Sequence, residues 1–177
     1  MATQNTGYES IGATNIETNR TAAMQIECPV AGNIISASIY MDSNGDATDV
    51  ISALYNPTTD SRFNGTADDV IVRATDEAVN IARGSPEWVT LDFASPYACA
   101  VDELLWIAFA TSFTTSWYIF YDSNSTGEQN AYGPAAGDAL DDPYTHSFTN
   151  DWDLSIYVTI DTGGGDVVIE VPLGPVW

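Results

Sequence analysis

Lysine is absent from this chain, and arginine occurs only four times, at Arg20, Arg62, Arg73 and Arg83. Against these four cations stand 25 aspartate and glutamate residues, which give a formal net charge of -21. Nucleic acids and anionic membranes are bound mainly through lysine and arginine, because their phosphate groups need positive partners. The composition therefore excludes binding to nucleic acid or to an anionic membrane through a basic surface.

Histidine and cysteine, which carry much of the chemistry of enzymes, are also scarce. The only histidine, His146, falls in a predicted loop, and no Gly-x-Ser-x-Gly motif occurs. A lone loop histidine is typical of a solvated side chain. Cys28 and Cys99 are 71 residues apart and lack the CxxC spacing of a metal or redox site. Cys28 and Cys99 are either two buried thiols or a disulfide. Because the sequence offers no catalytic motif, we expect no enzymatic activity and no required cofactor.

Long hydrophobic runs are missing as well. No stretch of about 18 apolar residues occurs, so the sequence predicts no membrane-spanning segment. The first residues, MATQNTGYES, have neither the basic region nor the apolar region of a secretory signal. We therefore expect the protein to stay in the compartment of its synthesis or to leave by another route, such as inside a virus particle.

The acidic excess itself predicts an environment. A net charge of -21 on a domain of this size repels itself strongly at low salt. The Debye length falls from about 8 Å at about 0.15 M salt to about 3 Å at about 1 M, so concentrated salt removes most of this repulsion. The composition favours a protein of a halophilic source, and an acidic surface protein from a marine or mesophilic organism is the alternative.

What the sequence does contain is the alternation of β-strands, separated by Gly, Asn, Asp and Pro. In Trp88–Phe93, the side chains of Val89, Leu91 and Phe93 share one face, and Ile35, Ala37, Ile39 and Met41 repeat this pattern. The segment Leu104–Ala110 is apolar on both faces, which is typical of a central strand. We predict an all-β fold, a two-sheet antiparallel β-sandwich of jelly-roll type. The predicted strands are Ala22–Cys28, Asn33–Met41, Val50–Tyr55, Val70–Thr75, Glu87–Phe93, Leu104–Ser112, Trp117–Tyr121 and Leu154–Ile160.

The predicted sandwich occupies residues 21–161, after an N-terminal arm of residues 1–20. Within it, residues 122–151 are rich in Gly, Asn, Asp and Pro and predict a long loop without strands. Gly163, Gly164 and Gly165 form a flexible joint. The joint belongs to an apolar C-terminal arm, residues 162–177, that we expect to dock on a partner or on a neighbour's sheet edge. The alternative is that this segment forms a last strand of the same domain. Its candidate assembly residues are Val167, Val168, Ile169, Val171, Leu173, Val176 and Trp177.

Two further features are candidate binding sites. Asp42, Asn44, Asp46 and Asp49 place oxygen ligands at the spacing of a short loop around a hard cation, so a structural calcium site is one interpretation. An ordinary hairpin turn is the other, because the same residues are common in turns. The aromatic residues on or beside the long loop offer a ligand face that could stack on a surface glycan. These residues are Tyr118, Phe120, Tyr121, Tyr132 and Tyr144, and the candidate ligand face consists of Tyr121, Tyr132 and Tyr144.

Several runs follow one another between Thr21 and Ile160: AAMQIECPVAGNIISASIYMD, VISALYN, WVTLDFASPYACAVDELLWIAFATS, WYIFYDSN, a Gly/Asn/Pro loop and DLSIYVTI. This succession resembles a family of jelly-roll modules from bacterial and archaeal surface proteins and from structural proteins of tailed viruses. The shared pattern includes a Pro-x-x-Gly turn, a strand ending in Ile-Tyr, and a closing Ile-Tyr-Val-Thr strand. The family is not defined by a catalytic residue set, so the resemblance implies a fold and no active site.

We therefore expect a virion structural protein, of the capsid-decoration, turret or tail-fibre type, from a virus that infects a halophilic host. Its partners would be copies of itself and other virion proteins, and the protein would be located in the virion. The alternative is a carbohydrate-binding or adhesive module of a cell-surface protein, located outside the cell.

Overall fold

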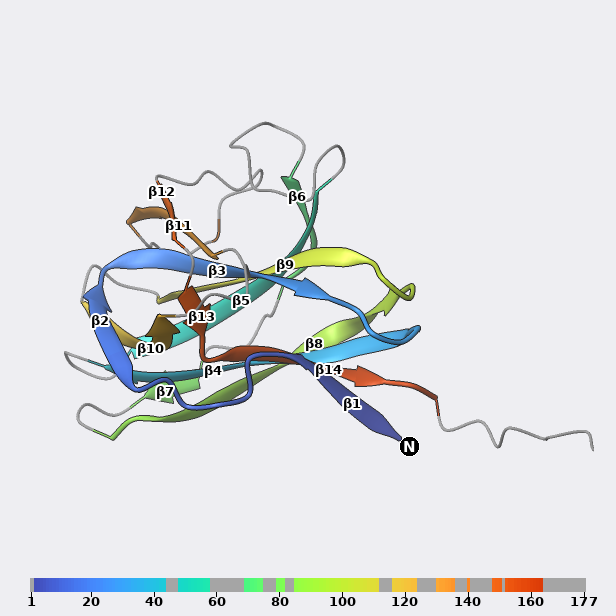
Figure 1. Cartoon of the computed structure of the whole chain (residues 1–177), viewed down its shortest axis with the longest axis horizontal. Coiled ribbons are helices and arrows are strands. Elements are labelled where there is room, and N and C mark those ends of the chain that lie inside the picture. The colour runs from blue at the N-terminus through green and yellow to red at the C-terminus, as the bar shows by residue number, and fades with distance from the viewer. Residues whose placement is uncertain are drawn as a thin grey trace, which may run out of the picture.

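The computed structural model of the chain describes residues 2–43, 48–57, 69–74, 79–81, 85–111, 116–123, 130–135, 140, 148–150 and 152–163. These residues form antiparallel strands in two seven-stranded sheets, and no helix occurs among them. The predicted all-β, antiparallel, two-sheet fold is confirmed. Figure 1 shows the two layers, with β3, β5 and β9 in one and β4, β8 and β14 in the other.

Seven strands form the first sheet, which we call sheet A. Within it, β4 is central: β14 and β10 pair along one of its edges and β8 pairs along the other. The outer positions belong to β1 beside β14, and to β2 and β13 beside β10. Sheet A consists of β1 (Thr3–Gly7), β2 (Thr14–Thr18), β4 (Gly32–Ser43), β8 (Glu87–Cys99), β10 (Trp117–Ser123), β13 (Trp152–Leu154) and β14 (Ile156–Asp161).

The other seven strands form sheet B, whose main order is β12-β11-β3-β9-β5-β6, with β7 also paired to β5. Sheet B consists of β3 (Arg20–Glu27), β5 (Thr48–Pro57), β6 (Asp69–Ala74), β7 (Val79–Ile81), β9 (Leu104–Thr111), β11 (Asn130–Ala135) and β12 (Phe148–Asn150). Every predicted strand overlaps an observed one. The alternation of apolar residues located them because each sheet buries one face against the other.

The main core fills the space between the sheets. Val89 and Leu91 of β8 and Ile156 and Val158 of β14 point into it, as their alternation predicted. One face assignment is wrong: Ile34 reaches the core and Ile35 is only half-buried. The reason is a break in the β4–β8 register between Ile34 and Ser36, where a bulge reverses which side chains face inward.

The strand β9 is buried along almost its whole length, as its two-sided apolar pattern predicted. Its Leu105, Ile107 and Phe109 face the main core. Its Trp106 and Ala108 face the other way, into a second, smaller cluster that lies on the outer face of sheet B. This cluster contains Ala23, Ala53, Tyr55, Trp106 and Ala108, with Leu140 packed against it.

Two segments predicted to lie outside the sheets contribute strands. Residues 1–20, expected as an arm, include β1 and β2, which pair with β14 and β10. Residues 122–151, expected to hold no strand, include β11 and β12, and β11 pairs with β3. These strands have weak local patterns and form because they complete the open edges of stronger strands. The register of β11 breaks between Tyr132 and Ala135, on either side of a Gly-Pro pair.

The pairing of the central strands is nested. β5 pairs with β6 and β7, β4 pairs with β8, and β3 pairs with β9, so that strands progressively farther apart in sequence become neighbours. The nested pairs alternate between sheet B and sheet A. The jelly-roll assignment goes further than this pairing and stays a prediction.

Candidate binding surface

The outer face of sheet A carries four half-buried aromatic side chains from four different strands. Tyr40 of β4, Trp88 of β8, Phe120 of β10 and Tyr157 of β14 form what we call the aromatic cluster. Their sequence neighbours Ile39, Val89, Ile119 and Val158 are buried in the main core. Because successive side chains of a strand point to opposite faces, these buried neighbours fix the four rings on the outside.

The rings contact one another at steep angles, two of the pairs edge to face and the third tilted. Tyr40 and Trp88 are register partners, with ring centroids 5.5 Å apart and planes at 62°. The Tyr40–Phe120 centroids are 5.0 Å apart at 73°, and the Trp88–Tyr157 centroids are 5.0 Å apart at 60°. These distances and angles are favourable for aromatic pairs, so the rings hold one another in position. The aromatic cluster is therefore organised before any partner arrives.

Polar side chains surround the aromatic cluster. Ser38 and Thr90 form the register pair two positions from Tyr40 and Trp88, on the same face of β4 and β8, and their hydroxyl oxygens are 2.8 Å apart. On the β10 side, the Tyr118 hydroxyl donates to the Glu17 carboxylate at 3.4 Å. Asp92 is exposed two positions beyond Thr90 on β8. The carboxylates and hydroxyls give the surface many hydrogen-bond acceptors around an apolar centre.

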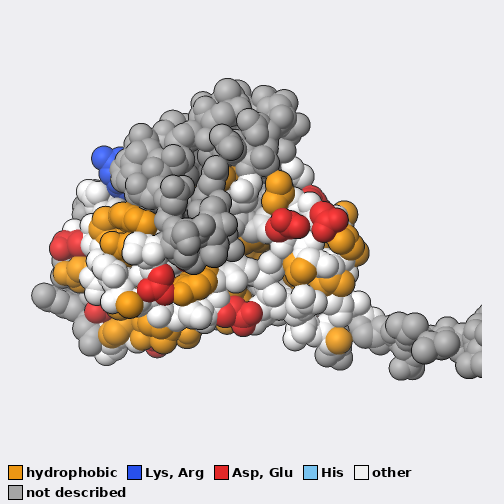
Figure 2. All heavy atoms as spheres, in the orientation of Figure 1, with side chains coloured by type: hydrophobic (Ala, Val, Ile, Leu, Met, Phe, Trp, Pro, Cys, Tyr) orange, Lys and Arg blue, Asp and Glu red, His pale blue; other side chains and the backbone are white. Residues whose placement is uncertain are grey.

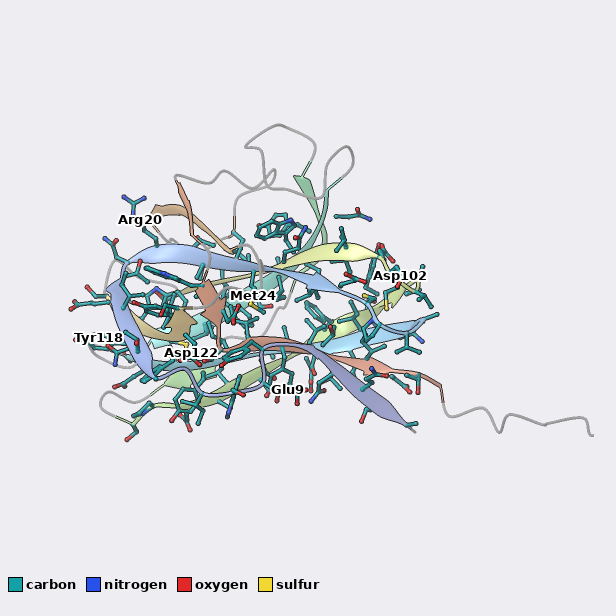
Figure 3. The ribbon with its side chains drawn as sticks, viewed as in Figure 1. Glu9, Arg20, Met24, Asp102, Tyr118 and Asp122 are labelled. Atoms are coloured by element: carbon teal, nitrogen blue, oxygen red, sulfur yellow. The ribbon has the colours of Figure 1, made fainter. Side chains whose placement is uncertain are left out.

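The two sheets differ in what covers their outer faces. On sheet B, Trp106 and Tyr55 are fully buried, so that face is not an open surface at these positions. On sheet A, the aromatic cluster is only half-buried. Figure 2 shows hydrophobic side chains gathered along the lower margin of the molecule, on the side where Figure 1 places sheet A. Arg20 belongs to sheet B, and Figure 3 places it on the opposite side of the molecule.

The ligand face predicted from sequence lies largely outside the described side chains and stays a prediction. Tyr121 stacks on Trp152, with centroids 4.2 Å apart and planes at 18°, and both pack against the main core. Tyr132 lies in β11 of sheet B, opposite Ala22, and its side chain is outside the described part; Tyr144 is outside it altogether. Sequence reasoning missed the aromatic cluster because no single strand contains it. The available signal was that each of its rings adjoins an inward-facing core residue.

The predicted metal site falls mainly outside the described residues. Asp42 lies near the end of β4, opposite Tyr118. Asn44 and Asp46 are not described, and of Asp49 only the backbone in β5 is. Among the side chains that are described, no group of three metal-ligating residues occurs. The calcium interpretation therefore stays a prediction, as does the alternative turn.

The candidate assembly residues of the C-terminal arm also lie outside the described part of the chain, and so does His146. They are Val167, Val168, Ile169, Val171, Leu173, Val176 and Trp177. Their role as a docking segment stays a prediction.

Cys28 and Cys99 are both buried and both free thiols, so of the two interpretations left open by the sequence the structure contains the thiols. Close to them, the Glu103 carboxylate accepts hydrogen bonds from the Tyr97 hydroxyl at 2.6 Å and the Ala100 amide at 2.8 Å. Burial and the hydrogen bond to Glu103 raise the pKa of Tyr97 to about 12. This network closes one end of the sandwich.

No protein-family model matches this sequence, and no curated protein matches it. In the part of the chain that the structure describes, no helix is long and apolar enough to cross a membrane. The aromatic cluster on sheet A is the feature on which a functional proposal rests.

Proposed function

We propose that this chain is a structural protein of a virus particle, of the decoration, turret or tail-fibre type, and that it assembles through the aromatic cluster. The observation that carries the proposal is that Tyr40, Trp88, Phe120 and Tyr157 gather on an outward sheet face while remaining half-buried. A partly exposed apolar patch on an outward sheet face is one feature that marks interaction sites. Aromatic residues are also the commonest anchors of protein interfaces.

The occupant that we propose for the aromatic cluster is the apolar C-terminal arm of a neighbouring copy. The described chain ends at Gly163, two residues after β14. The residues from there to Trp177 span at most roughly 45–50 Å when extended. Tyr157 lies six residues before Gly163, about 20 Å back along the chain, so the arm is long enough to cross to an adjacent subunit's aromatic cluster. Such a contact repeated around a ring would give a closed symmetric oligomer.

The resemblance to jelly-roll modules of tailed viruses fits this proposal, and the nested pairing of β3 with β9, β4 with β8, and β5 with β6 and β7 supports it. The net charge of -21 and the absence of lysine support a host that lives in concentrated salt. There, screening lets acidic subunits approach one another closely.

The experiment compares oligomeric state in concentrated salt by sedimentation velocity. Deletion of residues 166–177 and, separately, Trp88→Ala should each convert an oligomer of the full chain into monomers. Val101→Ala is the matched control, because it truncates an apolar side chain that is 53% exposed in the turn between β8 and β9. If the deleted and full chains sediment alike, the arm is not the occupant.

Glycan binding is a second candidate, favoured by the ring of acceptors around the same rings. Sugar hydroxyls donate to carboxylates such as Glu17 and Asp92, and the apolar face of a sugar stacks on an aromatic ring. Because the surrounding charge is negative, the ligand would be a neutral glycan.

A fluorescence titration with soluble β-glucan and soluble starch tests this second candidate. Binding that saturates with the full chain and disappears in Trp88→Ala would support it. The variant lacking residues 166–177 separates the two candidates, because it should still bind sugar while losing assembly. Absence of binding to every neutral glycan tried would leave the assembly proposal as the only one.

A further inference from the structure

The two cysteines lie at the junction of the two sheets. Cys28 directly follows β3 of sheet B, and Cys99 is the last residue of β8 of sheet A. Both side chains belong to the main core, where Cys28 is fully buried and Cys99 is 5% exposed. The backbone of Cys28 pairs with Asp102 and Glu103, which follow Cys99 by three and four residues, and both cysteine side chains pack in the same core cluster. Two residues far apart in sequence thus meet at the same end of the core.

Backbone hydrogen bonds hold both cysteines in place. The Cys28 amide donates to the Glu103 carbonyl at 2.9 Å, and the Cys28 carbonyl accepts from the Asp102 amide at 2.8 Å. Cys99 is the register partner of Gly32, and its thiol donates to the Val30 carbonyl at 3.8 Å. Figure 3 shows Asp102 at the end of the sandwich away from Tyr118.

We propose that Cys28 and Cys99 form an oxidisable pair, which a small peroxide converts into an intrachain disulfide between sheet A and sheet B. One thiol sulfur attacks the peroxide oxygen, the O–O bond breaks, and a sulfenic acid and one water form. The second thiol sulfur then attacks the sulfenic sulfur, and a second water leaves as the S–S bond forms. Overall, two thiols are oxidised and one hydrogen peroxide is reduced to two waters.

Burial determines which oxidant can react and how fast. It raises the pKa of the Cys28 thiol, with the hydrogen bond to Cys99 and the nearby Glu103 and Glu27 charges adding to the effect. The thiolate is the reactive form, so the reaction at neutral pH is slow and speeds up as the pH rises. A hydrogen peroxide molecule is small enough to reach the pair during local opening, whereas a bulky disulfide reagent is poorly suited to it.

The disulfide would close a loop of about 70 residues that contains β4 to β8, and it would restrict the unfolded chain accordingly. It would also prevent the two sheets from separating at this end. The expected consequence is a rise in melting temperature of roughly 10 °C. This site does not depend on the proposed function.

The test treats the reduced full chain with hydrogen peroxide under native conditions, then blocks any remaining thiol and digests the chain with trypsin. Because only arginine offers cleavage sites, Cys28 appears in the peptide of residues 21–62 and Cys99 in that of residues 84–177. We expect the two peptides to be joined and to separate on reduction, with a mass loss of about 2 Da for the intact chain. Cys28→Ala and Cys99→Ala should each show no joined peptide and no rise in melting temperature.

Three results would overturn the proposal. Both thiols could stay reduced, the two cysteines could accumulate as separate sulfinic or sulfonic acids, or the disulfides could join different chains. The peptide map of the unaltered chain distinguishes these results without relying on the stability of either variant.

Discussion

The Tyr8 hydroxyl donates a hydrogen bond to the Asp122 carboxylate, and so connects the segment after β1 to β10, 114 residues farther along the chain. The other oxygen of the same carboxylate accepts from the Ala13 amide at 2.8 Å. This contact ties the connection between β1 and β2 to β10, and it adds to the strand pairing that joins this N-terminal segment to sheet A.

The Asp122 contact predicts a specific dependence of stability on pH. The hydrogen bond from Tyr8 and then that from Ala13 lower the pKa of Asp122, so the carboxylate is stabilised by folding. A lowered pKa contributes stability that is present above the ordinary value of about 3.9 and is lost as the pH falls through the folded value. The difference in unfolding free energy between the unaltered chain and Asp122→Asn should therefore be constant above about pH 5 and shrink towards pH 2.

The Tyr8 phenol predicts a second dependence of stability on pH, at alkaline pH. The hydrogen bond to Asp122, followed by burial, raises the pKa of Tyr8. Stability from this group is complete below about pH 10 and is lost as the pH rises through the folded value. In Tyr8→Phe, the unfolding free energy measured by urea titration should fall less at alkaline pH than in the unaltered chain. If both chains lose the same unfolding free energy at alkaline pH, the role given to Tyr8 is wrong.

Gly12 is predicted to be the least replaceable of the described glycines. It is buried, its amide donates to the Ser155 hydroxyl at 2.9 Å, and an added Cβ would lie 2.5 Å from the Tyr121 Cα. Because backbone cannot yield as a side chain does, Gly12→Ala should cost roughly 2–3 kcal/mol of unfolding free energy. Gly163→Ala is the control: its added Cβ meets nothing within 4 Å, and only its φ of 69° costs about 1 kcal/mol. Equal losses in chemical denaturation would refute the packing argument.

Two tryptophans on sheet A should differ sharply in their effect on stability. Trp117 is fully buried and its indole donates to the Arg20 carbonyl at 3.2 Å, so Trp117→Ala should cost about 3–5 kcal/mol. Trp88 is half-buried, and its replacement by alanine removes mainly the contacts with Tyr40 and Tyr157. Trp88→Ala should therefore cost only about 1–2 kcal/mol of unfolding free energy. If Trp88→Ala is as destabilising as Trp117→Ala, the aromatic cluster serves the fold rather than a partner.

The charge predicts that salt stabilises the chain. Melting temperature should rise markedly between about 0.1 M and about 3 M KCl, because screening removes repulsion among the carboxylates. Neutralising exposed positions of sheet A with Glu17→Gln and Asp92→Asn should reduce this salt dependence. Equal melting temperatures at the two salt concentrations would exclude the halophilic interpretation.

Parts of the fold were readable from local sequence. The strands β3, β4, β8, β9 and β14 carry enough alternating or continuous apolar residues to be located from the sequence, because burying one face dictates a period of two. β1, β2, β7, β11 and β12 were missed, since their stability comes from pairing with neighbours rather than from their own pattern. The bulge beside Ile35 could not be predicted from the sequence either, because it arises from the pairing of β4 with β8.

The sequence by itself determined the charge, the all-β class and most of the core positions, because each depends on composition or on the alternation within one strand. Only the tertiary structure decided that Tyr40, Trp88, Phe120 and Tyr157 meet on one face, and that Cys28 and Cys99 lie together. Those contacts join strands distant in sequence, and the pairing of such strands is set by the packing of the whole sandwich.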